Sequence, residues 1–330
     1  MNLLFPVILF LALLLAGRAA LANPDCHMSE NPNRSVRACT QLIEQNPRHS
    51  HAYNSRGDAY LALGEIDRAI ADYTKQIALN PRHGHAYNGR GNANLAKGNI
   101  ESAVDDFGKQ IALNPRHPYA YCGRADAYQR SGELDKAIED YGRQIASNPR
   151  HEYAYNGRGN AYLAKGDFER AIDDYSRQIA ISPRHPYAYS GRGDAYREIS
   201  YFERAIEDYN RQIAINPDHA YAYGGRGATY EQAGQLEQAI QDYEKQIEIH
   251  PTHHHALLGR ARANMNLGNT ERALHEIDIC LAQAPDDSEA LYTRAQILQA
   301  LGRYEESAAE LERALSEHSE KPPNQQAQSP

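Results

Sequence analysis

The stretch SHAYNSRGDAYLALGEIDRAIADYTKQIALNPRH, residues 50–83, recurs along the chain with a period of 34 residues. A glycine series that includes Gly64 and an alanine series that includes Ala69 keep this spacing. The period is clearest in eight prolines: Pro47, Pro81, Pro115, Pro149, Pro183, Pro217, Pro251 and Pro285. A fixed period of this length is typical of repeat proteins, in which each unit packs only on its neighbours. Function is therefore expected on a surface built by repetition.

Each unit has the pattern of two antiparallel helices. Its first half carries apolar residues at helical spacing and ends at Gly64, and glycine commonly terminates helices. Its second half carries an i, i+3, i+4, i+7 apolar stripe that includes Ile66, Ala69 and Tyr73. Pro81 prevents the second helix from continuing.

The series Tyr53, Gly57, Tyr60, Gly64, Ala69, Tyr73 and Pro81 resembles the tetratricopeptide repeat (TPR). The resemblance implies an all-α fold, a right-handed superhelical solenoid of eight helix-turn-helix repeats that follows a degenerate N-terminal half-repeat. The repeats are expected at residues 50–83, 84–117, 118–151, 152–185, 186–219, 220–253, 254–287 and 288–321.

The chain departs from the family pattern at two regular positions. An arginine series beginning at Arg56 replaces the usual leucine, and a glutamine series beginning at Gln76 replaces the usual alanine. Each arginine is followed sixteen residues later by an acid, as Arg124 is by Asp140. We expect half-buried ion pairs between facing helices, the alternative being arginines that bind anions in a groove.

The N-terminal residues have the features of an export signal. Residues 3–17 are almost wholly apolar, and Ala20-Leu21-Ala22 has the small-residue pattern of a cleavage site. We expect residues 1–22 to be a secretory signal peptide and the mature chain to be periplasmic or secreted, with no membrane attachment. An uncleaved anchor is the alternative, because no Lys or Arg precedes the apolar run.

Both ends of the array are expected to be atypical. Residues 23–49 contain a degenerate capping repeat, and an oxidising compartment makes a disulfide between Cys26 and Cys39 plausible, with two buried free thiols as the alternative. Cys122 and Cys280 lie in distant repeats and are not expected to form a bridge. The polar segment 322–330 is expected to be disordered.

Composition excludes several classes of function. The net charge is −8 with both signs interspersed, so the chain lacks the basic surface that nucleic acid requires. No nucleophile–base arrangement, phosphate loop or carboxylate pair stands out from the repeat, so no enzymatic activity and no cofactor are expected.

The residues proposed to bind a partner lie off the core stripe of each first helix. A tyrosine two positions before the core tyrosine points roughly 200° away from it. In the resembled family this face lines the concave groove that holds partner peptides. The expected binding residues are Tyr119, Tyr153, Tyr187, Tyr221, Asn54, Asp58, Asn88, Asn92, Asp126, Asn156, Asn160 and Asp194.

Histidine also follows the period, from His49 to His253. Successive copies are expected about 10 Å apart, which is too far for shared metal coordination. We therefore expect an exported scaffold that binds a protein or peptide partner, in assembly or maintenance of a cell-envelope or secretion complex. The alternatives are a binder of polysaccharide or envelope polymer, and a metal-binding protein that uses the cluster His250, His253, His254 and His255.

Overall fold

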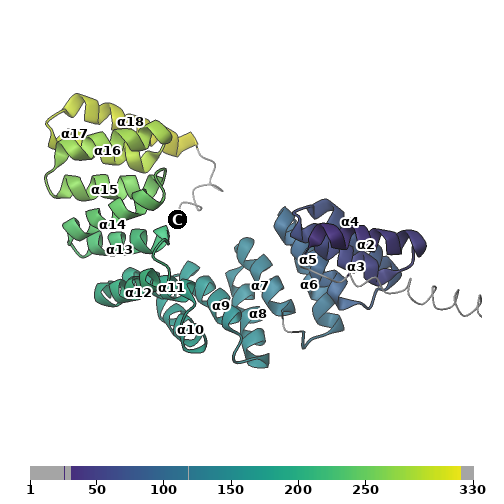
Figure 1. Ribbon diagram of the computed structural model, residues 1–330. Coiled ribbons are helices and arrows are strands. Elements are labelled where there is room, and N and C mark those ends of the chain that lie inside the picture. Colours follow the sequence, from purple (N-terminus) through teal and green to yellow (C-terminus); the bar gives the residue numbers. More distant parts are fainter. Residues whose placement is uncertain (1–25, 27–30, 118, 321–330) are drawn as a thin grey trace, which may run out of the picture. The chain divides into compact units, whose positions relative to one another are not determined.

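The computed structural model describes Cys26, residues 31–117 and residues 119–320. Within these residues the regular structure is helical, from α2 to α18, without strands (Figure 1). The chain divides into two compact units, one ending at Lys165 and the other beginning at Gly166. The expected signal peptide, residues 1–22, and the expected disordered tail, residues 322–330, lie outside the described residues.

The first unit holds the helices up to Lys165. Their bounds are α2 (Pro32–Gln45), α3 (Ser50–Ala62), α4 (Ile66–Leu79), α5 (Gly84–Lys97), α6 (Ile100–Leu113), α7 (Ala120–Arg130), α8 (Leu134–Ser147) and α9 (Glu152–Ala164).

The second unit continues the same alternation of helices. Their bounds are α10 (Phe168–Ile181), α11 (Pro186–Glu198), α12 (Phe202–Ile215), α13 (Ala220–Gln232), α14 (Leu236–Ile249), α15 (His254–Asn266), α16 (Thr270–Gln283), α17 (Ser288–Ala300) and α18 (Tyr304–Glu320).

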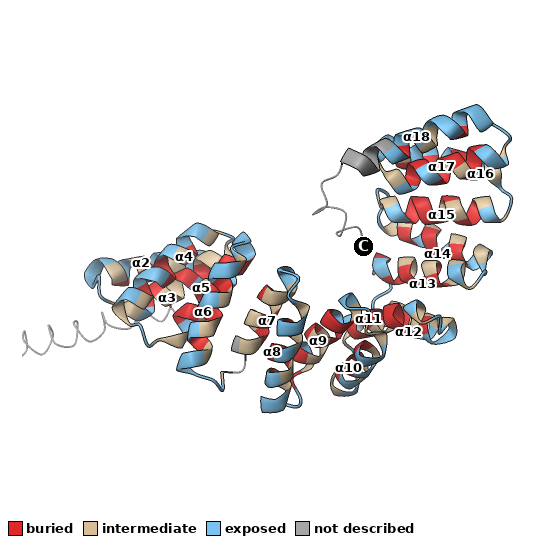
Figure 2. Ribbon diagram, turned by 180° about the vertical axis from the view of Figure 1, so that it is seen from behind, coloured by how far each residue is buried: buried red, intermediate tan, exposed pale blue. Residues whose placement is uncertain are grey.

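Within each unit, every helix packs against the next one in sequence. The first helices of neighbouring repeats also touch: α3 contacts α5, α5 contacts α7 and α7 contacts α9, and α11, α13, α15 and α17 continue the pattern in the second unit. The second helices of neighbouring repeats, as far as the structure describes them, make no such contact. First helices therefore form one layer of each unit and second helices the other, with buried residues on the faces between them (Figure 2).

Glycine ends most of the first helices in a left-handed conformation. Gly64, for example, has φ +74°. In the one repeat where glycine is missing, Ser200 adopts φ +60°, a conformation that costs energy for a residue with a Cβ atom.

On second helices from α4 to α14, a buried aromatic ring packs against small residues of first helices, whereas α16 carries Ile277 at this position. A Cβ atom added to Gly91 or Gly123 would stand 3.0 or 2.5 Å from the ring of Phe107 on α6. Tyr209 on α12 has the same relation to Gly193 and Gly225, at 3.1 and 2.5 Å. One of these glycines belongs to the ring's own repeat and the other to the next, so the ring joins two repeats.

The periodic arginines join three helices. The Nε and Nη2 atoms of Arg90 on α5 lie 2.9 and 2.7 Å from the carboxylate of Asp106 on α6, and Nη1 donates to Thr74 on α4 at 3.0 Å. The structure forms the expected ion pair for Arg56–Asp72, Arg90–Asp106, Arg124–Asp140, Arg192–Asp208, Arg226–Asp242, Arg260–Glu276 and Arg294–Glu310. The arginines therefore hold helices together, as expected.

A disulfide lies within the N-terminal capping repeat. Cys26 and Cys39 form a disulfide with a Cα–Cα distance of 4.8 Å, and both residues are buried. Leu42 on α2 and Ala52 on α3 complete the small apolar cluster around the bridge. The disulfide thus covers the edge of the first repeat, which has no preceding repeat to pack on.

Thiol titration tests this bridge. Unfolding the protein without reductant should expose two reactive thiols, from Cys122 and Cys280, and four thiols would contradict the disulfide. Denaturant is required because burial raises the pKa of both free thiols to about 12. Cys39→Ser should lower the free energy of unfolding by about 2–4 kcal/mol, towards the lower value because the loop is short. Cys122→Ser is the matched control, in which the bridge remains.

Candidate partner-binding groove

Four tyrosines of the first helices are strongly exposed. The exposed fractions are 59% for Tyr119, 49% for Tyr153, 57% for Tyr187 and 52% for Tyr221. Each lies at the start of a first helix, two residues before the tyrosine that faces the neighbouring helices. Large exposed aromatic surface that recurs on successive first helices within each unit is uncommon in a monomeric protein.

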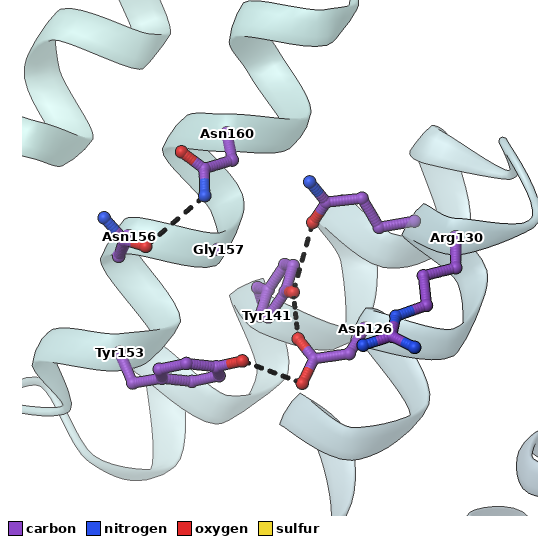
Figure 3. A pocket seen from close by; sticks show the side chains of 8 residues that line it. Asp126, Arg130, Tyr141, Tyr153, Asn156, Gly157 and Asn160 are labelled. Carbon is purple, nitrogen blue, oxygen red and sulfur yellow. Dashed lines mark hydrogen bonds between the residues drawn. The ribbon is translucent and has the colours of Figure 1, made fainter. Parts of the chain in front are cut away.

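The hydroxyl of Tyr153 is fixed by the preceding repeat. It donates a hydrogen bond of 2.8 Å to Asp126 Oδ2 on α7, and the hydroxyl of the buried Tyr141 donates to Asp126 Oδ1 (Figure 3). The carboxylate of Asp126 therefore connects the exposed ring of Tyr153 to the buried ring of Tyr141.

The second unit contains the same arrangement. Asp194 accepts hydrogen bonds from Tyr221 at 2.7 Å and from the buried Tyr209 at 2.6 Å. Arg197 stands 3.5 Å from the same carboxylate and supplies a compensating charge. The repetition shows that the connection follows from residue type and period.

Burial dominates the electrostatics of this carboxylate. It raises the pKa of Asp126 above its ordinary value, while the hydrogen bonds from Tyr141 and Tyr153 oppose that rise. Burial and the neighbouring Asp126 raise the pKa of Tyr153, so its hydroxyl stays protonated and remains a donor. Because this hydroxyl is engaged, Tyr153 offers a ligand chiefly the face of its ring.

A pocket of about 300 Å³ lies beside this carboxylate. On the α9 side of the pocket, Asn160 Nδ2 donates to Asn156 Oδ1 at 3.3 Å. Arg130 lines the α7 side and also donates to the carbonyl of Leu95 at 3.1 Å. Four of the expected residues share the pocket, and they come from α7 and α9: Asp126, Tyr153, Asn156 and Asn160 (Figure 3).

The remaining expected residues lie elsewhere along the first helices, outside this pocket. On α3, Asn54 donates to Asp58 at 2.9 Å, and Asp58 also accepts the hydroxyl of Tyr73 at 2.6 Å. Asn88 is half-buried and Asn92 exposed on α5.

Tyr119 and Tyr187 contact histidine rings. Tyr119 lies 5.4 Å from His151, and Tyr187 lies 5.7 Å from His219, measured between ring centroids. From the sequence we expected successive periodic histidines to be separated. We did not predict that another aromatic ring, such as that of Tyr119 between His117 and His151, would stand between them.

The role of Arg130 and Gln129 at the pocket was also missed, because neither residue type follows the period. A usable signal was present in the spacing of 27 residues between Asp126 and Tyr153, which recurs between Asp194 and Tyr221. The comparison of equivalent positions hides this signal, because the two residues occupy different positions in neighbouring repeats.

The described part of the chain gives no support for the metal-binding alternative. Within Cys26, residues 31–117 and residues 119–320, no group of three or more His, Cys, Asp or Glu side chains is placed to hold a metal ion. In the same residues, no helix combines the length and the apolar character needed to cross a bilayer.

Comparison with known proteins agrees with the repeat. A tetratricopeptide repeat model matches residues 56–120, 122–186 and 258–324, and two further models of this repeat match residues 38–71 and 194–264. The chain belongs to the tetratricopeptide repeat family. No curated protein matches this TPR protein significantly.

Solved structures share the fold at low identity. A tetratricopeptide repeat protein from Parabacteroides merdae is 17% identical, with a TM-score of 0.61 over 76% of this chain and 98% of its own. The APC/C hetero-tetramer Cut9-Hcn1 contains a chain that is 17% identical, with a TM-score of 0.62 over 81% of this chain. This TPR protein spans about half of that second chain, 53%. At this identity the likeness shows the all-α repeat fold alone.

Replacing Asp126 tests the connection between groove and core. Asp126→Ala should lower the free energy of unfolding by about 1–3 kcal/mol, because it removes the main acceptor of the buried Tyr141 hydroxyl. Adding Tyr141→Phe should recover most of the loss, since a phenyl ring needs no acceptor. Denaturant unfolding followed by far-UV circular dichroism measures both.

The preceding repeat supplies the control. Its core ring is Phe107 and the equivalent of Asp126 is the exposed Asn92, so Asn92→Ala should change stability by less than about 0.5 kcal/mol. If the double variant loses the plain sum of the two single losses, Asp126 and Tyr141 are not coupled.

Proposed function

We propose that this chain is an exported TPR scaffold that binds an extended peptide segment of a protein partner along its first helices. The fold and family support a role in protein interaction. Export is proposed from the apolar N-terminal segment, residues 1–22, and assembly or maintenance of a cell-envelope or secretion complex follows from that location.

The observation that carries the proposal is the fixed ring of Tyr153 beside an amide-lined pocket. Its hydrogen bond to Asp126 holds the side chain before any ligand arrives, which reduces the entropy lost on binding. Rigid aromatic rings of this kind often contribute a large share of the binding energy at an interface.

The polar groups of the pocket suit a peptide backbone. Asn156 and Asn160, which bond to each other at 3.3 Å, each carry both donor and acceptor atoms. An extended segment has unpaired N–H and C=O groups that such amides can satisfy, while its side chains pack on the tyrosine ring.

No catalytic activity or cofactor is proposed. The carboxylate of Asp126 is engaged by two tyrosine hydroxyls, and the groups around it include no base positioned to activate a nucleophile within the described pocket.

Polysaccharide is the competing ligand, because tyrosine rings beside amides also suit sugars. Crosslinking decides between the two. A photoreactive amino acid at position 153 should capture a polypeptide from periplasmic extract. The control is the same amino acid at position 136, an exposed residue of α8, which should capture none. Protease-resistant glycan captured at position 153, with no polypeptide, would contradict the proposal.

Affinity for the captured partner provides the quantitative test. Tyr153→Ala should weaken binding by about 1–3 kcal/mol, because the ring is proposed as a central anchor. The control Lys136→Ala, at an exposed residue of α8, should leave affinity unchanged. Both variants should remain folded, with a modest loss of stability in Tyr153→Ala from the missing hydrogen bond to Asp126, since the ring itself is about half exposed, at 49%. Unchanged affinity for Tyr153→Ala would contradict the assigned role.

A further inference from the structure

Histidine rings of successive repeats touch one another in the first unit. The ring centroids of His51 and His83 are 5.3 Å apart, those of His83 and His85 5.7 Å, and those of His85 and His117 5.5 Å. We call these four residues the histidine ladder. The line of rings continues through Tyr119, 6.4 Å from His117.

The repeat places these rings in one line. His83 is the N-cap residue of α5 and His117 precedes α7, while His51 and His85 lie in the first turns of α3 and α5. The ladder therefore alternates between residues before a helix and residues on its first turn, and it links the starts of α3, α5 and α7.

Few other polar groups face the ladder. Gln76 on α4 places its Nε2 atom 2.8 Å from His83 Nδ1. Asp58 on α3 interacts electrostatically with His85. Tyr119 on α7 is uncharged, and so is the amide of Gln76. Asp58 thus supplies the opposite charge, and it lies next to one imidazole of the four.

Protonation of His83 and His117 is resisted in the folded chain. Burial and the neighbouring His51 and His85 lower the pKa of His83, and burial and His85 lower the pKa of His117. The folded chain then binds fewer protons than the unfolded chain between these lowered values and the ordinary value of about 6.5. The corresponding stability is complete above about pH 6.5 and is lost as the pH falls through that window.

We propose that the histidine ladder is an acid-sensitive contact that holds the first repeats together at neutral pH and loosens them below about pH 6.5. Because each repeat packs only on its neighbours, the loosening is local to α3–α7. This inference does not depend on the partner proposed above.

The second unit provides an internal comparison. There the line runs His185, Tyr187, His219 and Tyr221, with centroid distances of 5.6, 5.7 and 6.4 Å. A tyrosine separates the histidines of this run, so protonating both histidines places no two charged rings in contact. Helices α11–α13 are accordingly not expected to loosen.

The chain itself suggests the test variant. His51→Tyr with His85→Tyr gives the first two repeats the tyrosine that later repeats carry at this position. In the His85→Tyr substitution the new tyrosine stands 27 residues after Asp58. This is the spacing at which the Tyr153 hydroxyl donates to Asp126. The ring contacts are kept while two protonation sites are removed. His275→Tyr, at an exposed residue of α16 outside the ladder, is the matched control.

Hydrogen exchange of the full chain, read by peptide mass spectrometry, measures the effect. Between pH 7.5 and pH 5.0, exchange in α3–α7, corrected for its intrinsic pH dependence, should accelerate about tenfold or more in wild type and in the His275→Tyr variant. In the double variant the acceleration should stay below about threefold. Equal acceleration in wild type and the double variant, or none in wild type, would overturn the proposal.

An NMR titration of the wild-type imidazoles keeps the proposal testable if the double variant does not fold. His83 and His117 should titrate below the ordinary histidine value of about 6.5. Titration of both at that value would overturn the proposal, because the ladder would then bind protons as freely as an isolated histidine.

Discussion

The close approach of an aromatic ring to glycine on two neighbouring first helices is the contact on which the rest of the structure depends. Phe107 is fully buried, and a Cβ atom at Gly123 would stand only 2.5 Å from its ring, so this position has no room for a methyl group. Arg90 stands between Gly89, which faces the ring of Tyr73, and Gly91, which faces Phe107. Phe107 joins α5, α6 and α7, and Arg90 joins α4, α5 and α6, so packing and charge pairing act on overlapping sets of helices. The resulting separation sets where every exposed residue of the first helix lies.

The same packing explains why the exposed ring of Tyr153 is held in place. Where the core ring is tyrosine, as at Tyr141, its hydroxyl emerges between repeats and requires an acceptor, which Asp126 supplies. The second oxygen of the carboxylate is then available to the next repeat, and Tyr153 occupies it. An exposed ring is thus held by a hydrogen bond that begins in the core, which explains how a half-exposed side chain can be ordered without a ligand.

The period, the alternation of helices and the ion pairs of the arginines were predictable because each depends on residues that recur at fixed spacing. The exposure of Tyr119, Tyr153, Tyr187 and Tyr221 was predictable for the same reason, since a helix rotates by a known angle for each residue. The hydrogen bond between Asp126 and Tyr153 was not, because it joins different positions of two repeats. Neither was the ladder of His51, His83, His85 and His117, whose contacts depend on the distance between first helices, and a sequence does not state that distance.

The most direct test of this account compares two glycines of the first unit. Gly123 on α7 would place a Cβ atom 2.5 Å from the Phe107 ring, whereas Gly108 on α6 would place one 3.8 Å from Arg124. Denaturant unfolding should show that Gly123→Ala lowers the free energy of unfolding by about 1–3 kcal/mol through overpacking. Gly108→Ala should raise it by about 0.5–1 kcal/mol, because alanine favours the helix. Equal stabilisation by both substitutions would contradict the claim that ring and glycine set the distance between repeats.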